Sequence, residues 1–162
     1  MALRKPLVIV SGQIQQIQSG DVLDSAVSGE VDVVSLENDT GAAAIVIGAP
    51  VYVKSAGKVD NAQADAVGTV EVIGLVAATT IAYQASGNIQ TDGILIATTG
   101  QWDAVTGETG GLTAGAVYYL DETTAGNLTQ TAPSSDSEFV VRIGKAVSTT
   151  AMEITILNAV KL

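Results

Sequence analysis

Hydrophobic and polar residues alternate in short runs along most of the chain, and glycine-rich, polar stretches separate the runs. The run Ala116–Leu120 shows this most clearly, because it consists of valine, tyrosine, leucine and alanine between turn-forming residues. Such residues suit the pleated, half-buried surface of a sheet, so the run predicts a strand. A polar connection, Glu122–Gly126, follows, and polar and apolar residues then alternate from Asn127 to Ala132. This period of two predicts the second arm of a hairpin.

The same arrangement occurs a second time, earlier in the chain. Each unit has a Gly-Ala start, a valine/tyrosine strand, a turn with glycine, and a downstream strand that contains Ile-Gly. These features occupy Gly48–Val53, Gly57 and Val72–Val76 in the first unit, and Gly115–Leu120, Gly126 and Arg142–Ala146 in the second. The turn glycines are 69 residues apart and the strand glycines, Gly74 and Gly144, are 70 apart. This near-constant offset predicts a duplicated β unit, at about 48–80 and 115–150.

The remaining runs also predict strands, at 31–36, 42–47, 69–77, 81–85, 88–91 and 93–99. We expect the second of these to be buried on both faces, because it is apolar almost throughout. Ser86-Gly87 predicts a turn, and Gly74 predicts a bulge or a close approach of two strands. The sequence therefore predicts an all-β fold. We expect a compact β-barrel or sandwich-like body, residues 29–162, built from two related hairpin units.

Residues 1–28 differ from the body and predict an extended N-terminal arm. They hold two of the seven basic residues and one short strand signal before Gly12. The basic and apolar residues of this arm are the candidate interaction residues: Arg4, Lys5, Leu7, Val8, Ile9 and Val10. Two interpretations remain open, because a terminal strand can add to the sheet of a neighbouring molecule or pair within its own domain.

Trp102 is the only tryptophan in the chain and is also a candidate interaction residue. Asp103 and Thr106 are placed to form a short helical or Asx turn after it, closed by Gly107. Tryptophan is common at the centre of protein interfaces, so Trp102 is a candidate contact. The alternative, which we favour, is that its ring closes the end of a small barrel.

The composition bears on function mainly by exclusion. The chain has no cysteine and no histidine, so thiolate sites and imidazole bases are excluded. The carboxylates lie in turns such as Asn38-Asp39 and Asp121-Glu122, where turn formation explains them better than a weak cation site does. Gly110–Gly115 lacks the lysine and the following helix of a phosphate-binding loop. We expect no enzyme activity, no cofactor and no resident metal.

Charge and hydropathy restrict the possible partners. With 17 acidic and 7 basic residues the formal net charge is −10, which disfavours direct binding of nucleic acid. No apolar run reaches the roughly 18 to 20 residues of a transmembrane helix, and the start of the chain lacks the core of a signal peptide. We therefore expect a soluble protein without a membrane partner. Only 6 residues are aromatic, and a body so poor in large side chains favours burial against further copies.

Three segments of the second half carry a resemblance to a known class of proteins. Gly111-Leu-Thr-Ala-Gly-Ala-Val-Tyr-Tyr-Leu-Asp121, Gly126-Asn-Leu-Thr-Gln-Thr-Ala-Pro133 and Phe139-Val-Val-Arg-Ile-Gly-Lys-Ala-Val-Ser148 resemble a C-terminal segment of many tailed-bacteriophage virion proteins. In the first half, Gly48–Val53, Gly57–Val59 and Val72–Val76 resemble the phage capsid cement family. Lys5–Gly12 is similar to the start of phage fibre-type proteins.

These resemblances imply a non-enzymatic structural protein of the virion. The expected function is that of a capsid decoration (cement) protein, made in the host cytoplasm and bound to the outside of the head, which it stabilises. The implied partners are the major capsid protein and further copies of the chain, in a homotrimer. A head-fibre or tail adaptor protein is the alternative within this class, and a virion polysaccharide-degrading enzyme is a less favoured one.

Overall fold

The structure, a computed structural model, describes residues 7–10, 13–16 and 31–162. The chain divides into two units, Met1–Glu30 and Val31–Leu162. In the first unit, β1 (Leu7–Val10) and β2 (Gln13–Gln16) form an antiparallel pair in which Ile9 is opposite Ile14. The predicted strand at Leu7–Val10 is therefore present. Arg4 and Lys5 lie outside the described residues, and the attachment role of this segment stays a prediction.

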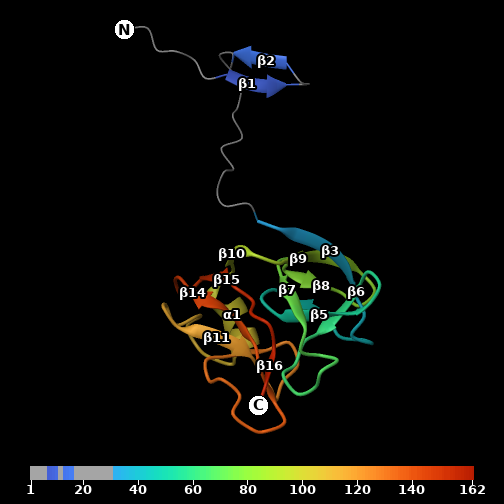
Figure 1. Cartoon of the computed structure of the whole chain (residues 1–162), viewed down its shortest axis with the longest axis vertical. Helices are drawn as coiled ribbons and strands as arrows, with labels where there is room; N and C mark the ends of the chain where they lie inside the picture. Colours follow the sequence, from blue (N-terminus) through green and yellow to red (C-terminus); the bar gives the residue numbers. More distant parts are fainter. Residues whose placement is uncertain (1–6, 11–12, 17–30) are drawn as a thin grey trace. The chain divides into compact units, whose positions relative to one another are not determined.

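The first half of the second unit contains a closed five-stranded barrel (Figure 1). Its strands, in chain order, are β3 (Val33–Asn38), β5 (Pro50–Ser55), β6 (Lys58–Asn61), β7 (Val72–Val76) and β9 (Ser86–Gln90). They lie in the order β3-β6-β5-β7-β9, and β9 pairs with β3 to close the ring. The β3–β6 contact is parallel and the others are antiparallel. A two-stranded sheet of β4 (Ile45–Val46) and β8 (Thr80–Ile81) accompanies the barrel.

The second half contains an open five-stranded sheet. Its strands are β10 (Gly93–Ile96), β11 (Val117–Leu120), β12 (Leu128–Thr129), β14 (Arg142–Ala146) and β15 (Ala151–Ile154). They lie in the order β10-β15-β14-β11-β12, with antiparallel neighbours throughout. The helix α1 (Thr99–Thr106) follows β10, and a short pair of β13 (Phe139–Val140) and β16 (Val160–Lys161) completes the half.

The two halves have four strand pairings in common, which agrees with two related hairpin units. If the five strands of each half are numbered along the chain, the barrel has the order 1-3-2-4-5 and the open sheet the order 1-5-4-2-3, so the pairs 3-2, 2-4, 4-5 and 5-1 occur in both. In the first half, the pairing of strand 1 with strand 3 (β3 with β6) contributes to the closure of the ring. In the second half β10 and β12 are the two sheet edges, and α1 packs against β12.

The glycines that suggested the duplication occupy matching positions. Gly57 and Gly126 have φ angles of 76° and 80°, as predicted for two glycine turns. The ladder shifts register next to Gly74 in β7 and next to Gly144 in β14. A Cβ atom at Gly74 would collide with the carbonyl oxygen of Gln90, and one at Gly144 with that of Glu153. Both glycines are therefore required by the close approach of a neighbouring strand.

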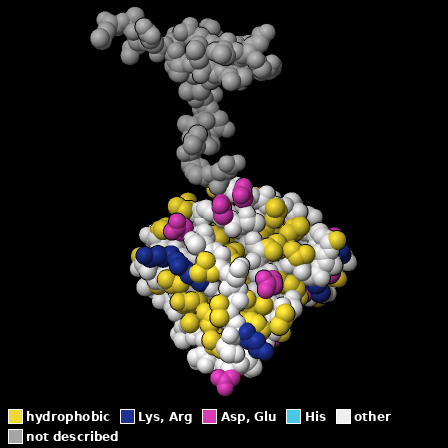
Figure 2. Space-filling view, viewed as in Figure 1, with side chains coloured by type: hydrophobic (Ala, Val, Ile, Leu, Met, Phe, Trp, Pro, Cys, Tyr) yellow, Lys and Arg dark blue, Asp and Glu magenta, His cyan; other side chains and the backbone are white. Residues whose placement is uncertain are grey.

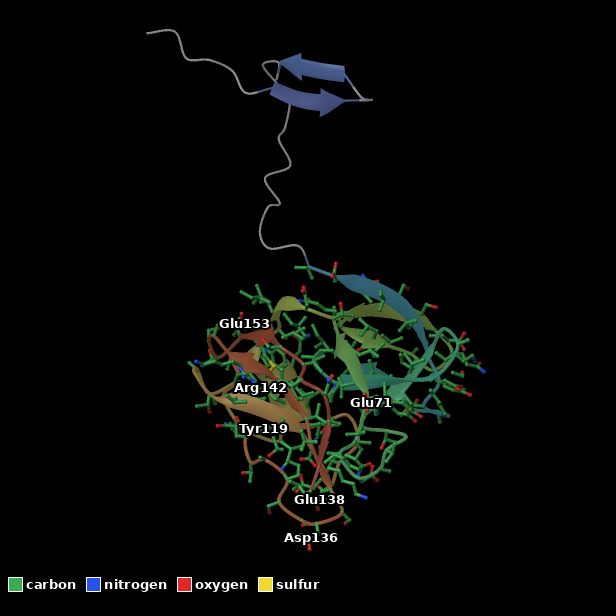
Figure 3. The ribbon with its side chains drawn as sticks, in the orientation of Figure 1. Glu71, Tyr119, Asp136, Glu138, Arg142 and Glu153 are labelled. Carbon is green, nitrogen blue, oxygen red and sulfur yellow. The ribbon has the colours of Figure 1, made fainter. Side chains whose placement is uncertain are left out.

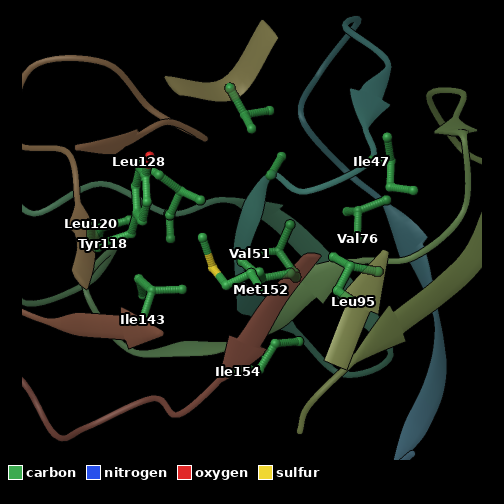
Figure 4. Close-up of a cluster of buried hydrophobic side chains, with 14 of the residues drawn as sticks. Ile47, Val51, Val76, Leu95, Tyr118, Leu120, Leu128, Ile143, Met152 and Ile154 are labelled. Carbon is green, nitrogen blue, oxygen red and sulfur yellow. The ribbon is translucent and has the colours of Figure 1, made fainter. Parts of the chain in front are cut away.

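A single hydrophobic core includes residues of both halves (Figure 4). Trp102 is fully buried in it and lies over Gly48, where an added Cβ would be 2.9 Å from the indole ring. The interpretation of Trp102 as an exposed contact residue is therefore wrong. The predicted helical turn with Asp103 and Thr106 is the end of α1, which begins before Trp102 and has Gly107 as its left-handed C-cap. The indole ring of Trp102 fills the space between α1 of the second half and the β4–β5 connection of the first half.

Three local predictions were wrong. The run at 81–85 is not a strand: only Thr80–Ile81 is one, and residues 83–84 form a turn. The apolar run at 42–47 is not a buried strand: only Ile45–Val46 is a strand, and residues 42–44 are exposed. Alanine contributes little burial, and the carbonyl of Ala43 accepts a hydrogen bond from the buried Asn38 side chain at 2.8 Å instead of joining a ladder. Ser86-Gly87 is not a turn either but the start of β9. Glycine is needed at position 87 because the Ile81 side chain occupies the space of a Cβ atom.

Candidate interaction surface

Corresponding rows of side chains cross the sheets of the two halves. In the first half, Pro50, Leu75, Gln90 and Val33 are cross-strand neighbours on β5, β7, β9 and β3. In the second half the same strand positions hold Val117, Lys145, Glu153 and Ile94. These rows are equivalent because their strands pair in the same register in both halves. The alternation of polar and apolar residues in the sequence does not reveal this equivalence.

The two rows differ in burial. In the first half Leu75 is 0% and Gln90 is 4% exposed, so the middle of the row belongs to the interior. In the second half Lys145 and Glu153 are exposed and Ile94 is 51% exposed. The surface that the first half buries within the molecule is thus accessible in the second half. The substitutions of leucine by lysine and of glutamine by glutamate agree with this difference.

A second row extends the accessible surface. Ile96 is opposite Ala151, whose carbonyl accepts a hydrogen bond from the Val147 N–H at 2.9 Å. Ile96 is 70% and Val147 is 50% exposed. Adjacent exposed aliphatic side chains of this size are typical of an interaction site when they form a contiguous patch.

We call this surface the outer face of the second sheet. It consists of the two rows together with the paired residues Tyr119 and Arg142: Ile94, Ile96, Val117, Tyr119, Arg142, Lys145, Val147, Ala151 and Glu153. Figure 3 labels Tyr119, Arg142 and Glu153 on β11, β14 and β15. Figure 2 shows basic and hydrophobic side chains next to one another over this part of the body.

The charge of this face differs from that of the rest of the body. Three acidic and two basic residues precede Val31, so 14 acidic and 5 basic residues remain in the body. Within residues 31–162, the ion pairs all involve Lys54 and Lys58, which contact Asp60, Glu37 and Asp39. Arg142 and Lys145 have no carboxylate within 4.0 Å in that part of the chain. The face therefore carries two unpaired cations and one acid in a strongly acidic protein.

The lysines of the first half serve the barrel instead. Lys54 donates to Asp60 at 2.9 Å, and Lys58 donates to Glu37 at 2.8 Å. Hydrogen bonding to these carboxylates raises the pKa of both lysines, although solvent screens such exposed pairs. The pairs join β5 to β6 and β6 to β3, so they support the closed barrel.

A polar cluster that sequence reasoning missed anchors the loop after α1. The hydroxyl of Tyr118 donates to Glu108 at 3.0 Å and accepts from the Thr113 N–H at 3.0 Å. Gln130 donates to Glu108 at 2.5 Å and to the Tyr118 hydroxyl at 3.2 Å. Burial raises the pKa of Tyr118. Tyr118 and Gln130 belong to the two segments that were predicted to form the hairpin. Glu108, directly after the C-cap glycine Gly107, was the one sequence signal that could have indicated this cluster.

The candidate polar motifs of the sequence have structural roles. Asp121 accepts hydrogen bonds from the N–H groups of Thr123 and Thr124, at 2.6 and 2.8 Å, which is an Asx-type turn. In the glycine-rich loop, the N–H groups of Gly110 and Gly111 donate to the Asp103 carboxylate at 3.2 and 2.6 Å. An internal anion thus occupies the amides that a phosphate would need.

In residues 31–162 and the two N-terminal strands, no three carboxylates come together as a candidate metal site. Helices of the length and apolarity needed to cross a bilayer are absent from the same described residues. Comparison with known protein families found no match. Comparison with curated proteins found none either. The interaction surface therefore rests on the geometry of the body.

Proposed function

We propose that the chain is a non-enzymatic structural protein of a tailed-phage virion that binds the outside of the head and reinforces it. The outer face of the second sheet carries this proposal, together with the phage resemblance of the segments from which β11, β12 and β14 are formed. In this account the body attaches through that face to the major capsid protein, and the N-terminal segment, with Arg4, Lys5 and Leu7–Val10, adds a second attachment.

The composition of the face supports a contact with a protein surface. Tyrosine and arginine are enriched at interface centres, and the face combines Tyr119 and Arg142 with the exposed aliphatic residues Ile94, Ile96 and Val147. The cations favour a partner surface that presents carboxylates. Many such contacts per head give retention without any single strong one. Reinforcement follows if copies bridge neighbouring capsid subunits where internal pressure separates them.

The test is co-sedimentation of purified chain with phage heads that lack it. Lys145→Glu reverses a charge on the face, and Lys161→Glu makes the same change on β16. We expect Lys145→Glu to weaken apparent affinity by about tenfold, most strongly at low salt. Lys161→Glu should bind as the unmodified chain does. Equal loss in both variants would show that binding reflects net charge and not this face.

The arm is tested by deleting residues 1–12. If the N-terminal segment supplies the second attachment, the shortened protein remains folded and soluble but occupies fewer sites on the heads. Full occupancy by the shortened protein would place attachment entirely on the body.

A further inference from the structure

The edge strand β10 leaves backbone groups without a partner in the described body. The N–H of Ala97 donates to the carbonyl of Thr150 at 2.9 Å, directly after the β10–β15 ladder. In an antiparallel ladder, hydrogen-bonded and non-bonded pairs alternate. Gly93 and Leu95 therefore direct their N–H and C=O groups to β15, and Ile94 and Ile96 direct theirs to the opposite, open side.

This edge lacks the features that usually prevent pairing between molecules. Lysine, proline and bulges protect natural edge strands. The four residues of β10 are Gly93, Ile94, Leu95 and Ile96, and their ladder with β15 runs without a register shift. The two residues that present free backbone groups are also among the most exposed aliphatic residues, at 51% and 70%. In the first half, the equivalent strand β3 is paired on both sides.

We infer that β10 pairs with β10 of a second copy of the chain, antiparallel and across a twofold axis at Leu95. In this register Ile94 of one copy is opposite Ile96 of the other, twice. Both pairs use outward-directed N–H and C=O groups, so four backbone hydrogen bonds form. Both pairs also lie on the outer face, so the exposed isoleucines of the two copies form one continuous apolar stripe.

Neighbouring registers fit less well. If one β10 is shifted by two residues along the other, Ile96 of one copy is opposite Asp92 of the second copy. With the opposite shift, Ile94 is opposite Thr98, the N-cap of α1. The register at Leu95 instead places Asp92 opposite Thr98. No acidic residue of one β10 edge then faces an acid of the other, which matters for two copies that each carry a net charge of −10.

The size of the contact sets its strength. A stable dimer needs roughly 1,000 Å² of buried surface or more, which exceeds what two four-residue edge strands supply. The contact is therefore weak in dilute solution and effective at high local concentration, as on a surface that holds many copies. It can join two monomers or two larger oligomers, so it is independent of the trimer that the resemblance implies and of the proposed function.

Disulfide trapping tests the register, because the chain has no cysteine of its own. Ile94→Cys and Ile96→Cys are prepared separately and oxidised in a glutathione buffer, alone and mixed in equal amounts. In the inferred register the unlike cysteines are opposite one another at a Cα distance of about 5.5 Å, suitable for a disulfide. Like cysteines are diagonal, at roughly 7 to 8 Å. We expect the mixture to give several-fold more covalent dimer than either variant alone.

Two controls make the result decisive. Val67→Cys places a cysteine at a residue that is also 70% exposed, outside the strands, and reports chance collisions. Ile96→Lys, a change at an exposed position, should abolish the rise in mean mass seen by light scattering at high concentration and high salt. Equal dimer yields for mixed and single variants, or yields no greater than for Val67→Cys, would overturn the inference. A fully protected β10 edge in hydrogen exchange at low concentration would also overturn it.

Discussion

At the scale of single residues, the glycines of positive φ provide the clearest test of the duplicated fold. Gly57 and Gly126 both have left-handed backbone angles, and valine in that region costs about 1 to 2 kcal/mol. The surroundings differ, because a Cβ at Gly57 has no neighbour within 4 Å, whereas one at Gly126 lies 2.8 Å from the Asn61 side chain. Asn61 belongs to the first half, so Gly126 also marks a contact between halves.

We therefore expect Gly57→Val and Gly126→Val to destabilise the body, and Gly126→Val to do so more. Denaturant unfolding followed by circular dichroism gives the two free energies of unfolding. Gly68→Val is the matched control, since Gly68 has open space around it and no positive φ. No loss at Gly57 would contradict the assignment of two equivalent glycine turns.

Tyr118 gives a prediction about pH. Burial raises its pKa above the usual value of 10.0, so the folded state holds the phenolic proton more tightly than the unfolded state does. The resulting stability is complete below about pH 10 and is lost as the pH rises through the raised folded pKa. Tyr118→Phe should be less stable at pH 7, by about 1 to 2 kcal/mol, because Glu108 and Gln130 lose a buried partner.

The measurement compares unfolding of the Tyr118→Phe variant and the unmodified chain between pH 8 and about pH 11.5. The difference between them should shrink above about pH 10. Lys54 and Lys58, whose pKa values are also raised, contribute equally to both proteins and cancel. A difference that stays constant or grows with pH would show that the hydroxyl is not held as described.

At the scale of elements, the bulges next to Gly74 and Gly144 are the most specific feature of the duplicated sheet. Alanine at either position would press its Cβ into the carbonyl oxygen of the adjoining strand. We expect Gly74→Ala and Gly144→Ala each to cost about 1 to 3 kcal/mol, comparable to overpacking in a core. Gly100→Ala in α1 has open space and should be neutral or stabilising. Thermal unfolding of the three variants checks this, and a tolerated alanine at both bulges would contradict the register.

Much of the element structure could be predicted from the sequence, because the alternation of β11 and β12, the turn at Gly57 and the Ile-Gly strands are local signals. The stretch at 42–47 and the start of β9 were mispredicted because tertiary contacts decided them: the carbonyl of Ala43 binds Asn38, and Gly87 accommodates Ile81. The outer face of the second sheet was not predicted. Lys145, Glu153 and Ile94 come together only through the register of three strands, which a single sequence does not show.

At the scale of the whole molecule, the two halves have four strand pairings in common but bury and expose equivalent rows differently. The first half closes its ring and buries the row that contains Leu75, while the second half remains open and exposes the row that contains Lys145. The difference in closure and burial between the two halves thus leaves one free sheet face and the free edge of β10. The proposed function uses the face, and the inferred contact between copies uses the edge.

The trimer implied by the resemblance to cement proteins stays a prediction at this scale. Sedimentation equilibrium at micromolar concentration should give about three times the monomer mass of 16.4 kDa. Ile96→Lys should leave that mass unchanged, because the twofold contact is separate from a threefold one. A monomer in solution would contradict the prediction, unless trimers form only on decorated heads.

We propose that this chain decorates a phage head from outside, with the outer face of its second sheet against the capsid. A cryo-electron microscopy reconstruction of a virion that contains the protein tests it most directly. We expect density for the two-half β body on the outer capsid surface, with Arg142 and Lys145 at the contact with the major capsid protein. Density confined to the tail, or a body bound with this face turned to solvent, would contradict it.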